Sequence, residues 1–126
     1  MGLVAKLSNN YCSGLIAIAT AEAMLLGERC GLNPQDICKT IATGAGTSRI
    51  FELRAPLMAE QAFDPPTMRL DLWQKDMALI SDFAKDTGAS TPLFKATSSI
   101  YEAAIKRGLG QQDTAAIYTV MAQLTN

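Results

Sequence analysis

The sequence contains no histidine among its 126 residues. This absence excludes Ser-His-Asp and Cys-His catalysis, histidine-ligated zinc and the usual proton carrier of neutral pH. Acid/base chemistry would therefore fall to Lys, Asp, Glu, Tyr or Cys side chains. An excess of one charge is also lacking, because 11 basic residues stand against 12 acidic ones without a basic block. Neither a nucleic acid nor an acidic membrane surface is predicted as a partner.

The cysteines form no CxxC pair, and their odd number, Cys12, Cys30 and Cys38, suggests neither a disulfide framework nor a metal site. A reducing, cytoplasmic location without a bound metal is the expectation. A long hydrophobic run is also missing. The most apolar stretch, from residue 15 to residue 26, is about half the length of a membrane-spanning helix and contains Glu22, so we interpret it as a buried core helix. No secretory signal is recognisable at the N-terminus.

No segment alternates apolar and polar residues with the period of a strand, so the sequence predicts a single all-α domain with five or six helices. Apolar periodicity, capping residues, glycines and prolines mark the boundaries of these helices. The expected helices run from Gly2 to about Cys30, from Asn33 to Gly44, from Thr47 or Ser48 to a kink or end at Pro56, from Thr67 to Thr87, from Thr91 to Gly108, and from Asp113 to the region of Leu124.

The first expected helix is unusually long for a domain of this size. At 1.5 Å per residue it would reach about 40 Å, whereas a compact domain of this length has a diameter of about 35 Å. One small-and-polar stripe, Gly2, Lys6, Asn10 and Ser13, runs along its first half. Such a stripe on an otherwise apolar helix predicts contact with a ligand or another domain. The apolar remainder of the helix favours a homo-oligomer, because one small domain buries it with difficulty.

Lys6 and Asn10 are four residues apart, so their amine and carboxamide project from the same side of the helix. Both groups could converge on one small polar molecule. Spacing alone is a weak indication, because most lysine and asparagine side chains are simply solvated surface groups.

Three segments resemble a known family. The segment Gly2–Asn10, GLVAKLSNN, resembles the G-x-x-x-K-x-x-N-N motif that opens the C-terminal domain of the β-hydroxyacid dehydrogenases. The segment Met68–Met77, MRLDLWQKDM, is similar to the family's F-x-L-x-L-x-x-K-D-L, and Gly108–Ala116 resembles its final turn and helix. This family includes 3-hydroxyisobutyrate, tartronate semialdehyde and L-threonate dehydrogenases and is related to 6-phosphogluconate dehydrogenase.

The resemblance implies a helical domain like the C-terminal domain of 6-phosphogluconate dehydrogenase, with a long interdomain helix followed by about five others. It implies that Lys6 is the general acid/base of an NAD- or NADP-dependent enzyme that oxidises a small 3-hydroxy acid. Asn10 would then position the substrate and Lys75 would contact the cofactor. For Asp76, which follows Lys75, the alternative of an ordinary acid on a helix surface stays open.

One element of the family pattern is missing. No G-x-G-x-x-G follows a strand, and Gly44-Ala45-Gly46 lies between two expected helices, where it cannot bind a dinucleotide. We therefore expect residues 1–126 to be the substrate-binding and dimerisation domain, without its Rossmann cofactor domain and inactive alone. Residue 1 would then mark a cut through the interdomain helix. Met68 also replaces the family's usual phenylalanine.

A second hypothesis, from a different functional class, is a non-catalytic helical module that dimerises through its apolar helices. If such a module were complete, its own chain or a partner copy would cover the first helix. A separated dehydrogenase half would instead leave the Lys6 face open.

Overall fold

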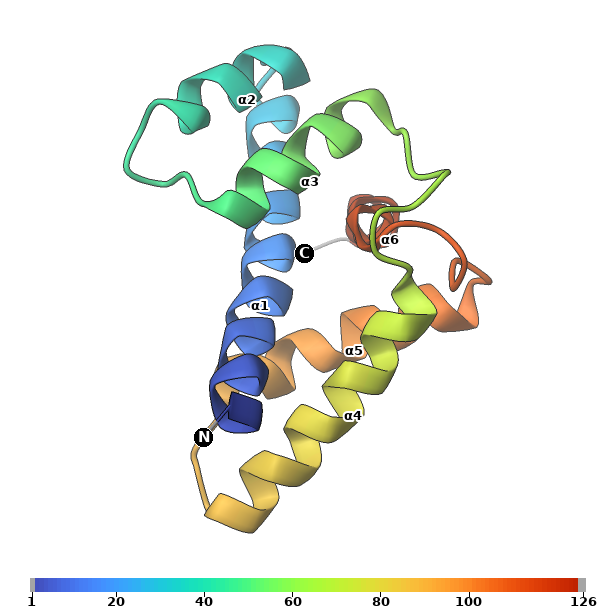
Figure 1. The fold of residues 1–126 in the computed structure, drawn as a ribbon. Helices are drawn as coiled ribbons and strands as arrows, with labels where there is room; N and C mark the ends of the chain where they lie inside the picture. Colours follow the sequence, from blue (N-terminus) through green and yellow to red (C-terminus); the bar gives the residue numbers. More distant parts are fainter. Residues whose placement is uncertain (1, 125–126) are drawn as a thin grey trace.

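The computed structural model describes residues 2–124, so the expectation concerning residue 1 lies outside the described residues. Within that range the chain is all-α and contains no named strand, which confirms the predicted fold class. Its elements are α1 (Gly2–Arg29), α2 (Pro34–Ala42), α3 (Arg49–Glu60), α4 (Leu70–Thr87), α5 (Pro92–Lys106), the 3₁₀ turn η1 (Thr114–Ala116) and α6 (Ile117–Ala122) (Figure 1).

Helix α1 is the central element of the domain. Its 28 residues extend for about 42 Å, and Figure 1 shows α2 and α3 near its C-terminal half and α4 and α5 near its N-terminal half. The C-terminal half is buried on several sides, with Ala21 and Met24 fully enclosed. The first turn is exposed, as the length comparison predicts for one end of this helix.

Local sequence explains where two of the helices begin. The Asn33 side chain accepts a hydrogen bond from the backbone N–H of Gln35 at 2.9 Å and caps α2. Of the two candidates for the next cap, Ser48 is the one that serves, because its hydroxyl accepts from the Phe51 N–H at 3.0 Å.

Of the two outcomes expected at Pro56, a kink or an end of the helix, the structure excludes the end. The helix continues to Glu60, with Pro56 on its exposed side. Phe51, Ala55 and Met58 are buried in the core. Burial of this face offsets the loss of one backbone hydrogen bond at the proline.

Helix α4 begins three residues later than its expected start at Thr67. The backbone before it pairs with a distant segment instead: Leu70 N–H donates to the Gln112 carbonyl, and Thr114 N–H donates to the Met68 carbonyl, each at 2.9 Å. The Arg69–Asp113 bridge lies between these hydrogen bonds. Long-range pairing of the backbone therefore replaces the first predicted turn of the helix.

Gly14 permits the close approach of α1, α4 and α5. A Cβ atom at this position would lie 2.4 Å from Cζ2 of Trp73. The Trp73 indole in turn packs against the Tyr101 ring, with 6.1 Å between the ring centroids. Glycine is therefore required at this crossing because a Cβ atom would clash with the indole, and not because the backbone needs a positive φ angle.

The Gly14→Ala variant is expected to lower the free energy of unfolding by about 2 kcal/mol, because the added methyl group overpacks the indole. Urea unfolding followed by circular dichroism would measure the change. Gly2→Ala is the matched control on the same helix, since a Cβ there meets no atom within 4 Å. Equal stability of the Gly14→Ala variant and the unsubstituted chain would contradict the packing argument.

Candidate functional site

A cleft of about 290 Å³ lies between the first half of α1 and the helices that cross it. Three charged side chains, several polar groups and apolar side chains line it. The residues are Lys6, Asn10, Ser13, Gly14 and Ala17 of α1, Ile50 and Arg54 of α3, Met68 of the linker before α4, Trp73 and Asp76 of α4, Tyr101 of α5, and Thr114 of η1. Three of the four residues of the polar stripe predicted on α1, all but Gly2, therefore line a cleft within this domain.

The structure brings two of the three predicted site residues together. Lys6 and Asn10 both line the cleft, with Lys6 at the exposed end of α1. Lys75 is exposed on α4 and does not belong to the lining. Its neighbour Asp76 is half-buried and lines the cleft. An amine, a carboxamide and a carboxylate thus face the same space, and together they can donate to, accept from and exchange a proton with a small polar molecule.

The inner end of the cleft contains a buried hydrogen bond. The Tyr101 hydroxyl donates to the carbonyl oxygen of Gly14 at 2.7 Å. Burial raises the pKa of Tyr101, although the positive charge of Arg54 opposes that rise. Tyr101 is therefore a neutral structural donor at neutral pH and no source of protons for chemistry.

Comparison with known proteins identifies the family of the chain. The family model described as "NAD-binding of NADP-dependent 3-hydroxyisobutyrate dehydrogenase" matches residues 1–121. The chain belongs to this family. The match confirms the predicted relationship to the β-hydroxyacid dehydrogenases.

Individual relatives cover nearly the whole chain. Glyoxylate/succinic semialdehyde reductase 2 of Arabidopsis thaliana is 30% identical over 92% of this chain and 32% of its own length. The 2-(hydroxymethyl)glutarate dehydrogenase of Eubacterium barkeri is 28% identical over 98% of this chain and 41% of its own length. The crystal structure of 3-hydroxyisobutyrate dehydrogenase from Salmonella typhimurium superimposes with a TM-score of 0.87 at 26% identity, covering 93% of this chain and 41% of that one. The chain therefore spans about two fifths or less of the length of these relatives.

Arg54 is the site residue that sequence analysis missed. The side chain is buried, and its Nη1 atom donates to the Thr67 hydroxyl at 2.6 Å. Its nearest charge is the Asp113 carboxylate, 3.6 Å from Nη1. Nothing in the local pattern of α3 distinguishes Arg54 from a surface arginine such as Arg49, because its surroundings come from segments far along the chain.

Asp113 anchors the segments that surround Arg54. Burial opposes ionisation of the carboxyl group, but hydrogen bonds from the N–H groups of Ala115 and Thr67, together with the charge of Arg54, hold the pKa of Asp113 below its ordinary value. The sequence identifies Asp113 as a helix cap, and its bond to Ala115 at 2.8 Å confirms that role. The long-range contacts of the same carboxylate come only from the tertiary structure.

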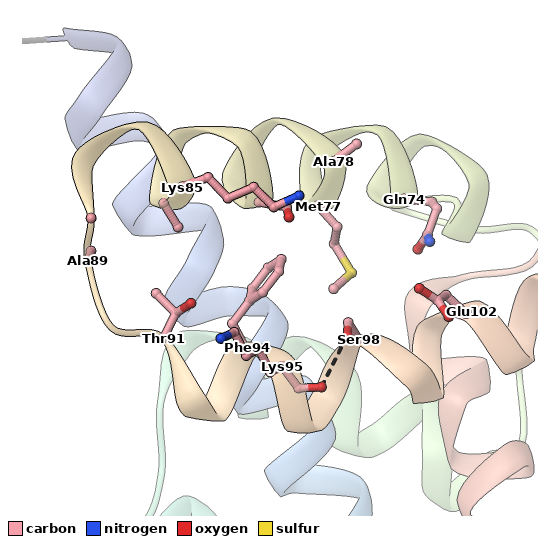
Figure 2. A pocket seen from close by; sticks show the side chains of 13 residues that line it. Gln74, Met77, Ala78, Lys85, Ala89, Thr91, Phe94, Lys95, Ser98 and Glu102 are labelled. Carbon is pink, nitrogen blue, oxygen red and sulfur yellow. Dashed lines mark hydrogen bonds between the residues drawn. The ribbon is translucent and has the colours of Figure 1, made fainter.

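A larger groove of about 550 Å³ separates α4 from α5, and Figure 2 shows it from close by. Met77 and Phe94 project into it from the two helices, and both are largely buried. Lys85 and Lys95 lie on opposite sides of the groove (Figure 2). None of the three predicted site residues lines it. Residue chemistry, and not size, therefore identifies the smaller cleft as the candidate site.

Among residues 2–124, no three histidine, cysteine, aspartate or glutamate side chains lie close enough together to hold a metal ion. No helix within the same range combines the length and apolar character needed to cross a bilayer.

Proposed function

We propose that residues 1–126 are the substrate-binding and dimerisation half of an NAD- or NADP-dependent dehydrogenase that oxidises a small 3-hydroxy acid. The observation that carries this proposal is the common cleft of Lys6 and Asn10 at the exposed end of α1. Membership of the dehydrogenase family and the partial length relative to its members support it. The dinucleotide-binding domain would lie outside these residues, and the part described here would be inactive without it.

Lys6 takes the hydroxyl proton of the substrate in this proposal. As the C–H bond of the carbinol breaks, its electron pair leaves as hydride, the O–H proton passes to the amine of Lys6, and a C=O bond forms. The nicotinamide ring, when bound, supplies the hydride acceptor. Asn10 lies one helical turn from Lys6 and positions the substrate through its carboxamide.

Exposed apolar residues at the start of α1 support the proposal that a further domain packs on this end of the helix. Leu3 retains 66% and Val4 37% of its accessible surface. Both residues precede Lys6 in the first turns of α1, and a domain packed on this end of the helix would reduce their exposure. Association of two copies stays a prediction from the sequence.

The test is an assay of the longer protein in which a dinucleotide-binding domain precedes residue 1, here termed the joined enzyme. It is expected to reduce NAD⁺ or NADP⁺ with a member of a panel of small 3-hydroxy acids that includes 3-hydroxyisobutyrate. Absorbance of the reduced nicotinamide follows the reaction. If the folded enzyme binds the dinucleotide and oxidises none of the panel, the proposed activity is wrong.

Lys75 is proposed to contact the cofactor from the exposed face of α4. In the joined enzyme, Lys75→Met is expected to raise KM for the dinucleotide about tenfold and to leave kcat nearly unchanged, because a ground-state ion contact is lost. Steady-state kinetics at saturating substrate measure both constants. Lys85→Met, on the same helix, is the matched control. An equal effect of the two substitutions would contradict the role of Lys75.

A further inference from the structure

Arg54 has hydrogen-bonding capacity that the protein does not use. Only 10% of its side-chain surface is accessible, and its Nη1 atom donates to Thr67. Within residues 2–124, its Nη2 and Nε atoms donate to no protein oxygen. A guanidinium group carries five N–H donors in a planar fork, so most of this fork is unpaired. The side chain nevertheless lines the cleft.

Asp113 does not depend on Arg54 for its hydrogen bonds. Its Oδ2 atom accepts from the Thr67 N–H and hydroxyl at 2.9 Å each and from the Met68 N–H at 3.2 Å. Its Oδ1 atom accepts from the Ala115 N–H at 2.8 Å. The Arg54 Nη1 atom is 3.6 Å away, beyond hydrogen-bond length. Asp113 therefore neutralises the charge of Arg54 without accepting a hydrogen bond from its guanidinium N–H groups.

Trp73 contributes a second unpaired donor in the same place. The residue is only 6% exposed, and its Nε1 atom is buried without a hydrogen-bond partner among the described residues. Trp73 lines the cleft together with Arg54, and its ring packs against that of Tyr101. Trp73 therefore forms part of the cleft wall.

These donors lie deeper than the proposed reacting groups. Tyr101, which packs on Trp73, is hydrogen-bonded to Gly14, and Gly14 follows Asn10 by one helical turn, about 6 Å along α1. Lys6 is a further turn toward the exposed end. A molecule whose reacting carbon lies beside Lys6 and Asn10 would reach the Arg54 end of the cleft with a short carbon chain.

We propose that Arg54 binds a second carboxylate of the substrate, remote from the carbon that is oxidised. The fork of an arginine matches the two oxygens of a carboxylate, and a buried arginine with free donors recognises such a group strongly. This inference rests on the proposed dehydrogenase function and specifies its substrate class, namely 3-hydroxy acids whose C2 side chain ends in a carboxylate.

The kinetic test uses the joined enzyme and two 3-hydroxy acids that differ only in a C2 side chain ending in carboxylate or methyl. Arg54→Met is expected to lower kcat/KM for the carboxylate-ended substrate about 100-fold and for the methyl-ended one less than about threefold. Arg54→Lys, which keeps the charge but not the fork, is expected to recover part of the loss. Equal losses with both substrates, or none with either, would overturn the proposal.

Arg49→Met is the matched control, because Arg49 is an exposed arginine of the same helix and lies outside the cleft lining. It is expected to change neither substrate's kcat/KM. Thermal unfolding of both variants would separate a loss of substrate recognition from a loss of the fold.

A binding experiment separates this proposal from the dehydrogenase activity itself. Trp73 is the only tryptophan of the 126-residue chain, so its fluorescence reports directly on the cleft. Titration with glutarate is expected to change the emission, and titration with pentanoate at the same concentrations is not. Arg54→Met should weaken glutarate binding at least about tenfold. If glutarate binds no better than pentanoate, the proposed carboxylate subsite is wrong. If glutarate binds selectively but the joined enzyme oxidises no hydroxy acid, only the proposed activity is wrong.

Discussion

Replacement of Lys6 by alanine is expected to lower kcat of the joined enzyme by about three orders of magnitude, the contribution of a general base to a proton transfer. Lys6 lines the cleft at the exposed end of α1 and forms no salt bridge within residues 2–124. Removing its side chain should therefore leave the fold intact, and KM for the dinucleotide should hardly change. Stopped-flow and steady-state absorbance of the reduced nicotinamide would measure the effect.

The Lys6→Arg variant tests whether Lys6 acts as an acid/base or only as a positive charge. Arginine keeps the charge but does not give up its proton at any pH used for assay. Loss of turnover in both variants would support proton exchange by Lys6. Lys39→Ala, at an exposed position on α2, is the matched control and should retain full activity. Normal turnover by Lys6→Ala would refute the assignment.

The Asp113→Ala variant is expected to lose about 3 kcal/mol of stability, because it leaves the Arg54 cation buried without its partner charge. The same change also leaves the N–H groups of Thr67, Met68 and Ala115 without their acceptor. Urea unfolding of the 126-residue chain measures the loss. Asp82→Ala, at an exposed position on α4, should shift stability by no more than about 0.5 kcal/mol. Comparable stability of the two variants would contradict the anchoring role of Asp113.

The contribution of Asp113 should also depend on pH. Its pKa in the folded protein is lower than the ordinary value of 3.8, so the unfolded chain binds the proton more readily. Stability from this group is therefore fully present at neutral pH and is lost as the pH falls below 3.8 toward the folded pKa. The stability difference between the unsubstituted chain and Asp113→Asn should shrink between pH 5 and pH 3. A constant difference over that range would contradict the lowered pKa.

The helices of this protein were largely predictable because their signals are local. Apolar periodicity predicts the long α1, and the side chains of Asn33 and Ser48 mark the starts of α2 and α3. Two of the differences come from tertiary contacts. Pro56 lies within α3 and residues 67–69 lie outside α4, since packing on α1 and pairing with residues 112–114 outweigh local preference.

The candidate site was predictable only in part. Lys6 and Asn10 share one helical face, so four residues of sequence suffice to place them together. Arg54 and Trp73 reach the same cleft from α3 and α4, and no spacing rule relates them to α1. Asp76 adjoins Lys75 in a segment that resembles the family motif, but sequence does not decide which of the two faces the cleft.

Short-range information thus determined the all-α class, most helix boundaries and the Lys6–Asn10 pair, because each depends on residues within a few turns of one another. The family followed from three short motifs spread along the chain. The tertiary structure alone decided how Asp113 meets Thr67 across 46 positions and how Arg54 and Trp73 come to line the cleft beside Tyr101. The physical reason is that burial and crossing of helices, and not the sequence neighbours of these residues, set the surroundings of their charges and donors.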